Sequence, residues 1–172
     1  MSDIPVQLLQ HLGKHGVRMR QFLSDDFSNI DDSQRREMAT EARQITAWAA
    51  AAIAPMPIPF ADIWTITPVQ MLMVRAIGNI YGYKIDSKTV KEMLAVIGGG
   101  MLGQQICLAL FKIGLPGAGG FGGAAFVFFW THGIGKAAEL YFQSGMTATA
   151  EELAAARKEG MEQAKNETPR TE

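Results

Sequence analysis

A glycine-rich run is the first candidate for chemistry in this sequence. Residues 117–122 read GAGGFG and match GxGxxG, a pattern whose glycines admit a pyrophosphate to the N-terminus of a helix. That pattern needs a preceding strand, a crossover unit and an acidic residue about 20 positions later. Glu139 is near that distance, but residues 106–113 continue a helical pattern and no βαβ rhythm follows. We therefore predict neither a dinucleotide site nor any other cofactor.

A second run, Gly133-Ile134-Gly135-Lys136, ends in the way that a phosphate-binding P-loop ends. The complete loop has a glycine five positions before its last glycine, and a serine or threonine after the lysine. Trp130 and Ala137 occupy those two positions here. The chain is therefore not predicted to hydrolyse nucleoside triphosphates itself.

His132 is the one histidine of the apolar body, with Thr131 beside it and Glu139 two turns away. A catalytic trio requires a nucleophile held by a base, and a base held by an acid. Nothing beyond proximity along the chain supports such a trio, so we favour a packed or pore-facing histidine and keep His132 as a weak functional candidate. We predict no enzyme, no catalytic residue and no metal site, since the single cysteine, Cys107, gives no metal-ligand spacing.

The elements that would position these residues come from a long apolar stretch, residues 93–142. Lys112 is its only full charge before Lys136. Two apolar segments, 93–111 and 121–134, flank the breaker 113–120, which contains Pro116 and four glycines. The pattern predicts a helical hairpin with a glycine-rich turn.

Glycine spacing predicts how this hairpin packs. Gly99 with Gly103, and Gly119 with Gly123, form GxxxG pairs, which allow two helix backbones to approach closely. Segment 93–111 just reaches the roughly 20 residues that a membrane crossing requires. The hairpin is therefore either inserted in a bilayer or is the core of a soluble domain. If it spans, the lysines at its ends mark the cytoplasmic side; they are Lys84, Lys88, Lys91 and Lys136.

The rest of the chain also has helical patterns and no convincing strand, which predicts an all-α helical bundle. An amphipathic helix over 4–23 and a helix over 34–54, capped within Asp31-Asp32-Ser33, precede a helix over 68–81. Thr149 and Glu152 form a capping box for a C-terminal helix. We predict these regions: a helical arm, 1–46; an apolar core, 47–145; a charged surface helix, 146–166; and a disordered tail, 167–172.

Two isolated charges in the apolar body need an explanation. Asp62 and Arg75 are each the sole full charge of a long apolar neighbourhood. An unpaired buried charge costs several kcal/mol, so these side chains must be paired or reach solvent. We favour a structural pair or exposure over a proton or ligand site.

The whole chain excludes some classes of function. Its 172 residues suffice for one domain, and a net charge of -1 gives no basic field for nucleic acid. The N-terminus lacks the pattern of a secretory signal, so we expect a protein that is kept in the cytoplasm or inserted from that side.

Segments 54–62, 70–82, 114–119 and 135–145 together resemble a bacterial family, domain-of-unknown-function 697, the YcjF-like domains. The resemblance covers about residues 47–160. It implies a membrane-associated helical domain, and some members follow an Era-like or Ras-like GTPase domain. Residues 1–46 stand in place of that GTPase here, which implies a GTPase partner supplied in trans.

These observations lead to one functional hypothesis and one alternative. The first is a membrane-associated helical module for anchoring, assembly or membrane remodelling, on the cytoplasmic side of the bacterial inner membrane. Its expected partners are membrane lipid, a GTPase-domain protein and further copies of the chain in a homo-oligomer, with no nucleic acid. The alternative is a soluble all-α interaction domain in the cytoplasm, with the glycine-rich hairpin as its core.

Overall fold

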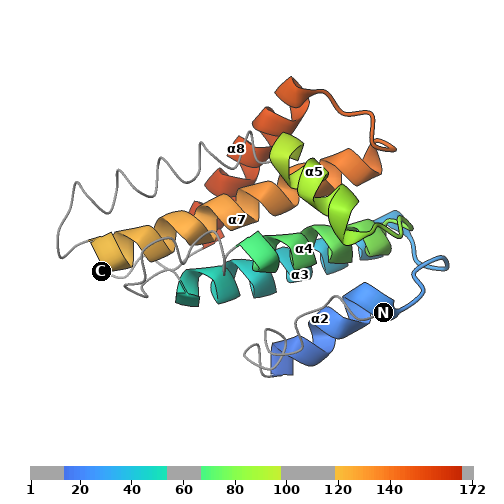
Figure 1. The fold of residues 1–172 in the computed structure, drawn as a ribbon, viewed down its shortest axis with the longest axis horizontal. Helices are drawn as coiled ribbons and strands as arrows, with labels where there is room; N and C mark the ends of the chain where they lie inside the picture. The colour runs from blue at the N-terminus through green and yellow to red at the C-terminus, as the bar shows by residue number, and fades with distance from the viewer. Residues whose placement is uncertain (1–13, 54–66, 98–118, 168–172) are drawn as a thin grey trace.

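A computed structural model describes residues 14–53, 67–97 and 119–167, and these residues form helices and connecting turns without a β-strand. The predicted all-α fold is confirmed for this part of the chain. The helices, drawn in Figure 1, are α2 Lys14–Ser24, α3 Asp32–Ile53, α4 Thr67–Ile80, α5 Ser87–Ile97, α7 Gly119–Gln143 and α8 Ala150–Glu167.

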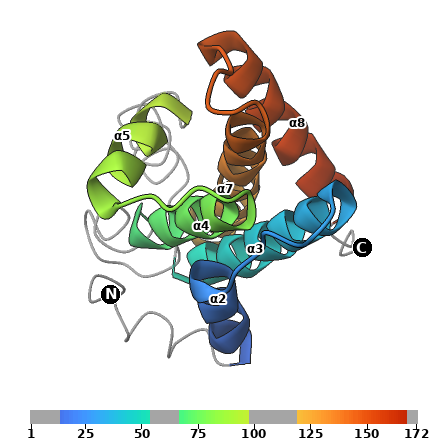
Figure 2. The ribbon, with the colours of Figure 1, turned by 90° about the vertical axis from the view of Figure 1, so that its right-hand side faces the viewer.

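Helix α7 is the centre of the bundle. It packs against α3 and α4 on one side and against α8 on the other, while α5 crosses over α4, α7 and α8. Helix α2 lies at the edge, against α4 and α3 (Figure 2). The arrangement gives α3, α4 and α7 a common long axis, so each end of the bundle combines one end of each of these helices.

Helix α4 is buried on almost every side. The apolar face expected from its sequence is buried in full, and further residues of the helix are buried as well. Gly78 allows this, because a β-carbon there would lie 2.7 Å from Ile85 Cδ1 and 3.1 Å from the ring of Phe142. The expected face comprises Val69, Leu72, Met73, Ala76, Ile77 and Ile80.

Local capping sets where the helices begin. Asp31 Oδ1 accepts a hydrogen bond of 2.8 Å from the backbone N–H of Gln34, whose side chain accepts one of 3.0 Å from the N–H of Asp31. Thr149 and Glu152 form the predicted capping box, with bonds of 2.8 and 3.3 Å. The backbone hydrogen bond from Thr149 lowers the pKa of Glu152. Asp86 caps α5 by accepting a 2.7 Å bond from Thr89.

Three helix C-termini are capped by side chains of other helices. Asn79 of α4 donates to two carbonyls at the end of α2, those of Phe22 and Asp25, at 3.0 Å each. Arg35 of α3 donates to the carbonyl of Ile80 at the end of α4. Arg157 of α8 donates at 2.7 Å to the carbonyl of Ile97 at the end of α5. These contacts satisfy orphan carbonyls, and the two arginines also complement the helix dipoles.

The hairpin differs from the sequence-based prediction where it is described. Helix α7 already begins at Gly119, inside the predicted turn 113–120, and it continues past Ile134 to Gln143. It continues because Ala137, Ala138 and Phe142 extend its buried face beyond the purely apolar segment. Segment 98–118, which holds the rest of the hairpin, lies outside the described residues.

Two boundaries of the predicted regions also fall differently along the helices. Helix α3 runs through the division placed between residues 46 and 47, and residues on both sides of it are buried. Helix α8 begins at Ala150, because residues 144–149 form a turn in which Gly145 and Met146 have φ angles of 69° and 66°. The predicted tail, apart from Glu167 in α8, lies outside the described residues.

Candidate functional site

A buried ion pair joins α3 to α7. Arg43 donates through Nη1 to Oε2 of Glu139, although the two residues are 96 positions apart. Both side chains are 4% exposed, so the charges face each other with almost no access to water. Arg43 also donates through Nη2 to the hydroxyl of Thr40 at 2.7 Å. Such a pair tolerates burial only because each charge has its partner and further hydrogen bonds.

Two further polar groups, one from α4 and one from α7, lie close to the carboxylate of Glu139. The hydroxyl of Tyr81, at the end of α4, donates to Oε1 at 3.2 Å. The ammonium of Lys136 lies 3.7 Å from Oε2, one turn earlier on α7 and closer to solvent. Burial, followed by the negative charge of Glu139 and its hydrogen bond, raises the pKa of Tyr81 above its ordinary value of 10.0. The phenol therefore acts as a donor and stays neutral at physiological pH.

Glycines on two faces of α7 make room for this arrangement. A β-carbon on Gly135 would lie 2.7 Å from Cδ of Arg43 and 2.9 Å from the sulfur of Met73. A β-carbon on Gly133 would lie 2.6 Å from the backbone carbonyl oxygen of Arg157 on α8. Gly160 of α8 is the reciprocal position, since its β-carbon would lie 3.1 Å from Cα of Gly133. The run 133–136, which has the end of a P-loop pattern, thus packs α7 against α3 and α8.

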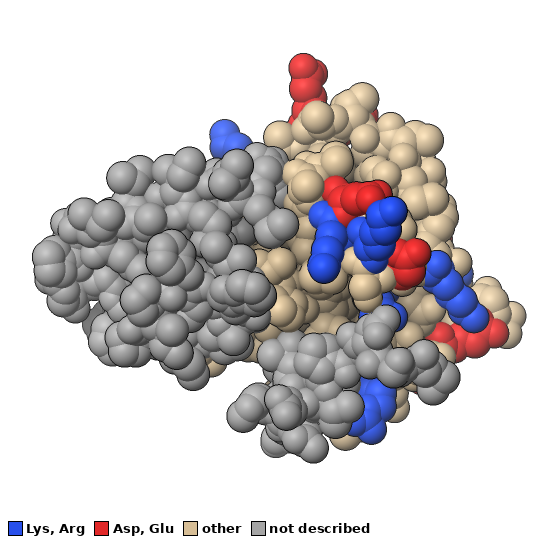
Figure 3. Space-filling model, in the orientation of Figure 1, with Lys and Arg blue, Asp and Glu red and all other residues tan. Residues whose placement is uncertain are grey.

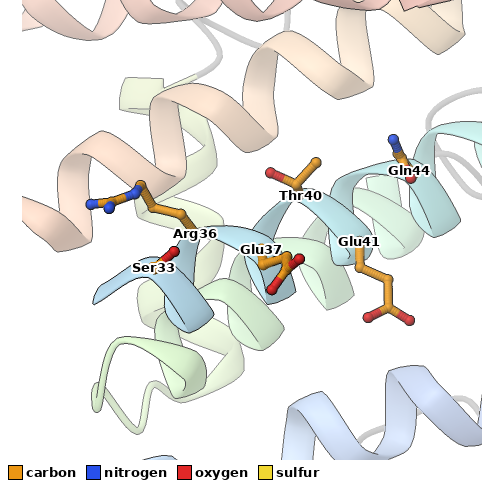
Figure 4. Close-up of a pocket in the computed structure, with 6 residues that line it drawn as sticks. All are labelled: Ser33, Arg36, Glu37, Thr40, Glu41 and Gln44. Carbon is orange, nitrogen blue, oxygen red and sulfur yellow. The ribbon is translucent and has the colours of Figure 1, made fainter. Parts of the chain in front are cut away.

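A polar pocket of about 560 Å³ lies along the outer face of α3 (Figure 4). Thr40 connects it to the buried pair, because its hydroxyl accepts from Arg43. Glu41 turns toward α2, where it forms a bidentate pair with Arg18 at 3.0 to 3.1 Å. The lining residues are Ser33, Arg36, Glu37, Thr40, Glu41 and Gln44. Charges of both signs line the pocket, and the described residues hold no group of three His, Cys, Asp or Glu side chains suited to a metal ion.

His132 and Thr131 lie inside the bundle, one turn or more from the ion pair. His132 is 1% exposed, and its ring centre is 6.0 Å from that of Phe128. The hydroxyl of Thr131 accepts a 3.2 Å hydrogen bond from the side chain of Gln70 on α4. These surroundings are those of core side chains, and Glu139 is engaged with Arg43 and Tyr81.

The other residues singled out from the sequence are distributed differently. Arg75 lies half-buried in the middle of α4. Gly119 and Gly123 lie in the first turns of α7, but their surroundings are not among the described features. Asp62, Gly99 and Gly103 fall outside the described residues. The close helix contacts that the structure does describe are made by Gly78, Gly133, Gly135 and Gly160.

Sequence reasoning missed Arg43 and Tyr81, although one signal was available for Arg43. Small buried residues recur along α3 at helical spacing, and Arg43 falls within that stripe. The stripe comprises Ala39, Ala42, Thr46, Ala47 and Ala50. A charge on a stripe of small residues indicates a buried charge, and a buried charge requires a partner.

Three helical segments of the bundle lack charge. Helix α3 carries no charged residue from Gln44 to its end, α4 none before Arg75, and α7 none before Lys136. These three segments meet at one end of the bundle, on the left of Figure 1. Trp48 is exposed there, and its ring centre lies 4.6 Å from that of Phe128.

Charged side chains of both signs gather around α5. On the face shown in Figure 3, acidic and basic side chains cover α5 and the turn that precedes it. Exposed charges of this region include both signs; they are Lys84, Asp86, Lys88, Lys91 and Glu92. The molecule therefore has a charged region around α5 and an uncharged end, named for the segments of α3, α4 and α7 that carry no charge there. Helix α8 borders this end, since its Ala164 packs against Ala47, Ala51 and Phe128. The charges that flank Ala164, Glu162 and Lys165, pair with each other at 3.0 Å.

Comparisons with known proteins identify a family without a known activity. No helix within the described ranges combines the length and the apolar character that a bilayer crossing requires. Neither the curated proteins nor the solved structures contain a match to the chain. A family model described as a domain of unknown function, DUF697, matches residues 19–166, from the middle of α2 almost to the end of α8. The match extends the resemblance noted in the sequence on both sides, and the chain belongs to the DUF697 family.

Proposed function

We propose that this chain is a membrane-associated helical module that rests its uncharged end on a lipid bilayer and assembles there with a partner. One observation carries the proposal: the charge-free segments of α3, α4 and α7 meet at a single end of the bundle, with Trp48 exposed beside them. Moving this end from water to a membrane interface would desolvate apolar surface without desolvating a full charge of these segments.

The sequence between the described helices supports the same orientation. Segment 54–66 joins the end of α3 to the start of α4, and segment 98–118 leads into the start of α7. Their only full charges are Asp62 and Lys112. Both connecting segments are therefore predominantly apolar in sequence.

A pair of matched substitutions tests this proposal. Ala125 on α7 and Ala154 on α8 are both exposed, and each lies near the start of its helix. We expect Ala125→Glu to weaken co-flotation of the full chain with phospholipid vesicles, because a charge at the interface opposes insertion. Ala154→Glu is the control and should float like the wild type. Equal flotation of the two variants, or no flotation of the wild type, would reject the proposal.

The alternative function is a soluble all-α interaction domain. The observation that favours it is the use of glycine contacts within the chain: Gly133 meets Gly160 and Gly135 meets Arg43, so close packing is satisfied inside one molecule. Under this alternative the chain stays in the supernatant after cell fractionation. Sedimentation with the membrane fraction, with release by detergent, supports the membrane module.

The partner in the proposal is a GTPase-domain protein supplied in trans, with self-association as a second mode of assembly. The support is the family resemblance, in which some members follow a GTPase domain. Cross-linking in cells that express the wild type or Ala125→Glu tests it. We expect a GTP-binding protein to be enriched with the wild type. Cross-links between copies of this chain alone would favour the homo-oligomer and reject the GTPase partner.

A further inference from the structure

We infer that Trp48 is the interfacial anchor of the uncharged end, with its indole at the headgroup level of a phospholipid bilayer. The inference rests on the proposed function and specifies the residue and the depth at which the chain meets lipid. Among the described residues, Trp48 is the aromatic side chain that is exposed.

The environment of Trp48 is unusual for a residue of its size. Its side chain is 59% exposed, whereas Ala47, Ala50 and Ala51 around it on α3 are buried. Phe128 of α7 supports one part of the ring at a centroid distance of 4.6 Å and an interplanar angle of 50°. Phe128 itself is 8% exposed and lies 5.6 Å from Phe129. The indole therefore has a fixed aromatic support and leaves most of its surface open.

The second described tryptophan has an internal role. Trp130 is half-buried, its ring stacks 5.8 Å from that of Phe126, and the guanidinium of Arg157 lies 5.3 Å from its ring centre. The aromatic surface of Trp130 is therefore occupied by contacts within the bundle. Trp48 has no such cation among the contacts described for it, so its open face is available to an external apolar phase.

Charge decides which external phase this is. The nearest charged residue before Trp48 on α3 is Arg43, which is buried and paired with Glu139. From Gln44 to Ile53 the helix presents no charge. On α8, which packs against the same cluster through Ala164, the flanking charges of Glu162 and Lys165 pair with each other at 3.0 Å and give no net charge that could select a charged protein partner. An indole combines a broad apolar ring with one N–H donor, and this combination favours the boundary between hydrocarbon and headgroups. Phospholipid is therefore the occupant that fits best.

Tryptophan fluorescence of the full chain with phosphatidylcholine vesicles tests the inference. We expect vesicles to shift the emission to the blue, and lipids brominated near the headgroup end of the acyl chain to quench it. Trp48→Phe, which keeps Trp130 and Trp64 in place, should remove most of the shift and the quenching. Trp48→Ser should weaken vesicle binding about tenfold, the amount expected for part of a buried aromatic side chain.

The outcomes separate the two levels of the proposal. If the chain floats with vesicles but wild type and Trp48→Phe give the same shift and quenching, Trp48 is not the anchor and the membrane module stands. If the chain does not float, the proposed function fails. A blue shift that depends on protein concentration in buffer, and disappears in Trp48→Phe, would place Trp48 in a protein contact and overturn the lipid assignment.

Discussion

The two ends of the α3–α4–α7 bundle are packed with different kinds of side chain. Around Arg43 and Glu139 the core contains charges, and each charge is held by a specific partner. Around Trp48 and Phe128 the core contains aromatic rings and alanines, among them Ala164 of α8. The first end specifies a single geometry through directional bonds, while the second depends on apolar contact that an external apolar phase could equally supply.

The fold is fixed at the ion pair and is open to a partner at the uncharged end. A buried ion pair adds little net stability over an apolar pair, but it penalises every arrangement that separates the two charges. It therefore fixes how α3 lies against α7. The uncharged end has no comparable restraint. It leaves Trp48, the largest exposed apolar side chain of the described residues, at the surface.

The largest expected effect comes from breaking the ion pair. Glu139→Gln leaves the buried guanidinium of Arg43 without its counter-charge, and we expect a loss of about 3–5 kcal/mol in the free energy of unfolding. Urea denaturation followed by circular dichroism measures it. Glu92→Gln, on the exposed face of α5, is the control and should change stability by less than about 0.5 kcal/mol.

A double substitution tests whether the unpaired charge causes this loss of stability. Arg43→Met combined with Glu139→Leu removes both charges, so it should recover most of the stability lost in Glu139→Gln. A double variant no more stable than Glu139→Gln would show that the loss comes from shape and not from the unpaired charge.

The second effect concerns the contact of α7 with α8. At an open helical site, Gly→Ala gains up to about 1 kcal/mol in helix propensity. Gly133→Ala should instead cost about 1–3 kcal/mol, because its new methyl group would meet the backbone carbonyl of Arg157. Thermal unfolding gives the sign directly, and a stabilised Gly133→Ala variant would contradict the close contact.

Gly82→Ala is the reference for this measurement. No atom beyond the adjacent residues lies within 4 Å of a β-carbon at Gly82, but its φ of 88° strains any other residue. Its cost of about 1–2 kcal/mol therefore reports backbone strain alone.

The third effect links Tyr81 to pH. Tyr81→Phe removes one hydrogen bond to Glu139 and should cost about 1 kcal/mol at pH 8. The pKa of Tyr81 is raised in the folded state, so its contribution is complete below pH 10 and is lost as the pH rises above 10. The wild type should consequently lose more stability between pH 8 and pH 11 than Tyr81→Phe does. Equal losses in urea titrations at the two pH values would contradict this role.

The smallest effect on stability is expected at the uncharged end. Trp48→Ser should cost less than about 1 kcal/mol in solution, since only its contact with Phe128 is lost. Phe128→Ala, on the buried side of the same aromatic pair, should cost about 3 kcal/mol or more. Similar losses in the two variants, measured by urea denaturation, would remove the distinction between the two ends of the bundle.

Much of the fold could be predicted because it depends on local patterns. The all-α class, the buried face of α4 and the capping residues Asp86, Thr149 and Glu152 follow from periodicity and from short-range hydrogen bonds. The extent of α7 could not be predicted from its apolar run, because its buried face continues through Ala137 and Ala138 beyond Lys136. Helix ends depend on tertiary contacts as much as on local composition.

The candidate site was less predictable than the fold. His132, Gly133 and Gly135 attracted attention because they match fragments of chemical motifs, yet the two glycines are explained by the helices they touch. Arg43 and Tyr81 match no motif, and they matter because they converge on Glu139. A sequence motif contains residues that are close along the chain, whereas the residues of this cluster come from three separate helical segments.

The sequence by itself determined the helical class, the family, the positions of the caps and the segments that carry no charge. Only the tertiary structure decided that Arg43 meets Glu139 across 96 positions, that Gly133 faces Gly160, and that the uncharged segments share one end. The physical reason is that periodicity tells which face of a helix is buried, but not which helix covers it. The partner is selected by the combined packing of all the faces, so it is a property of the folded chain.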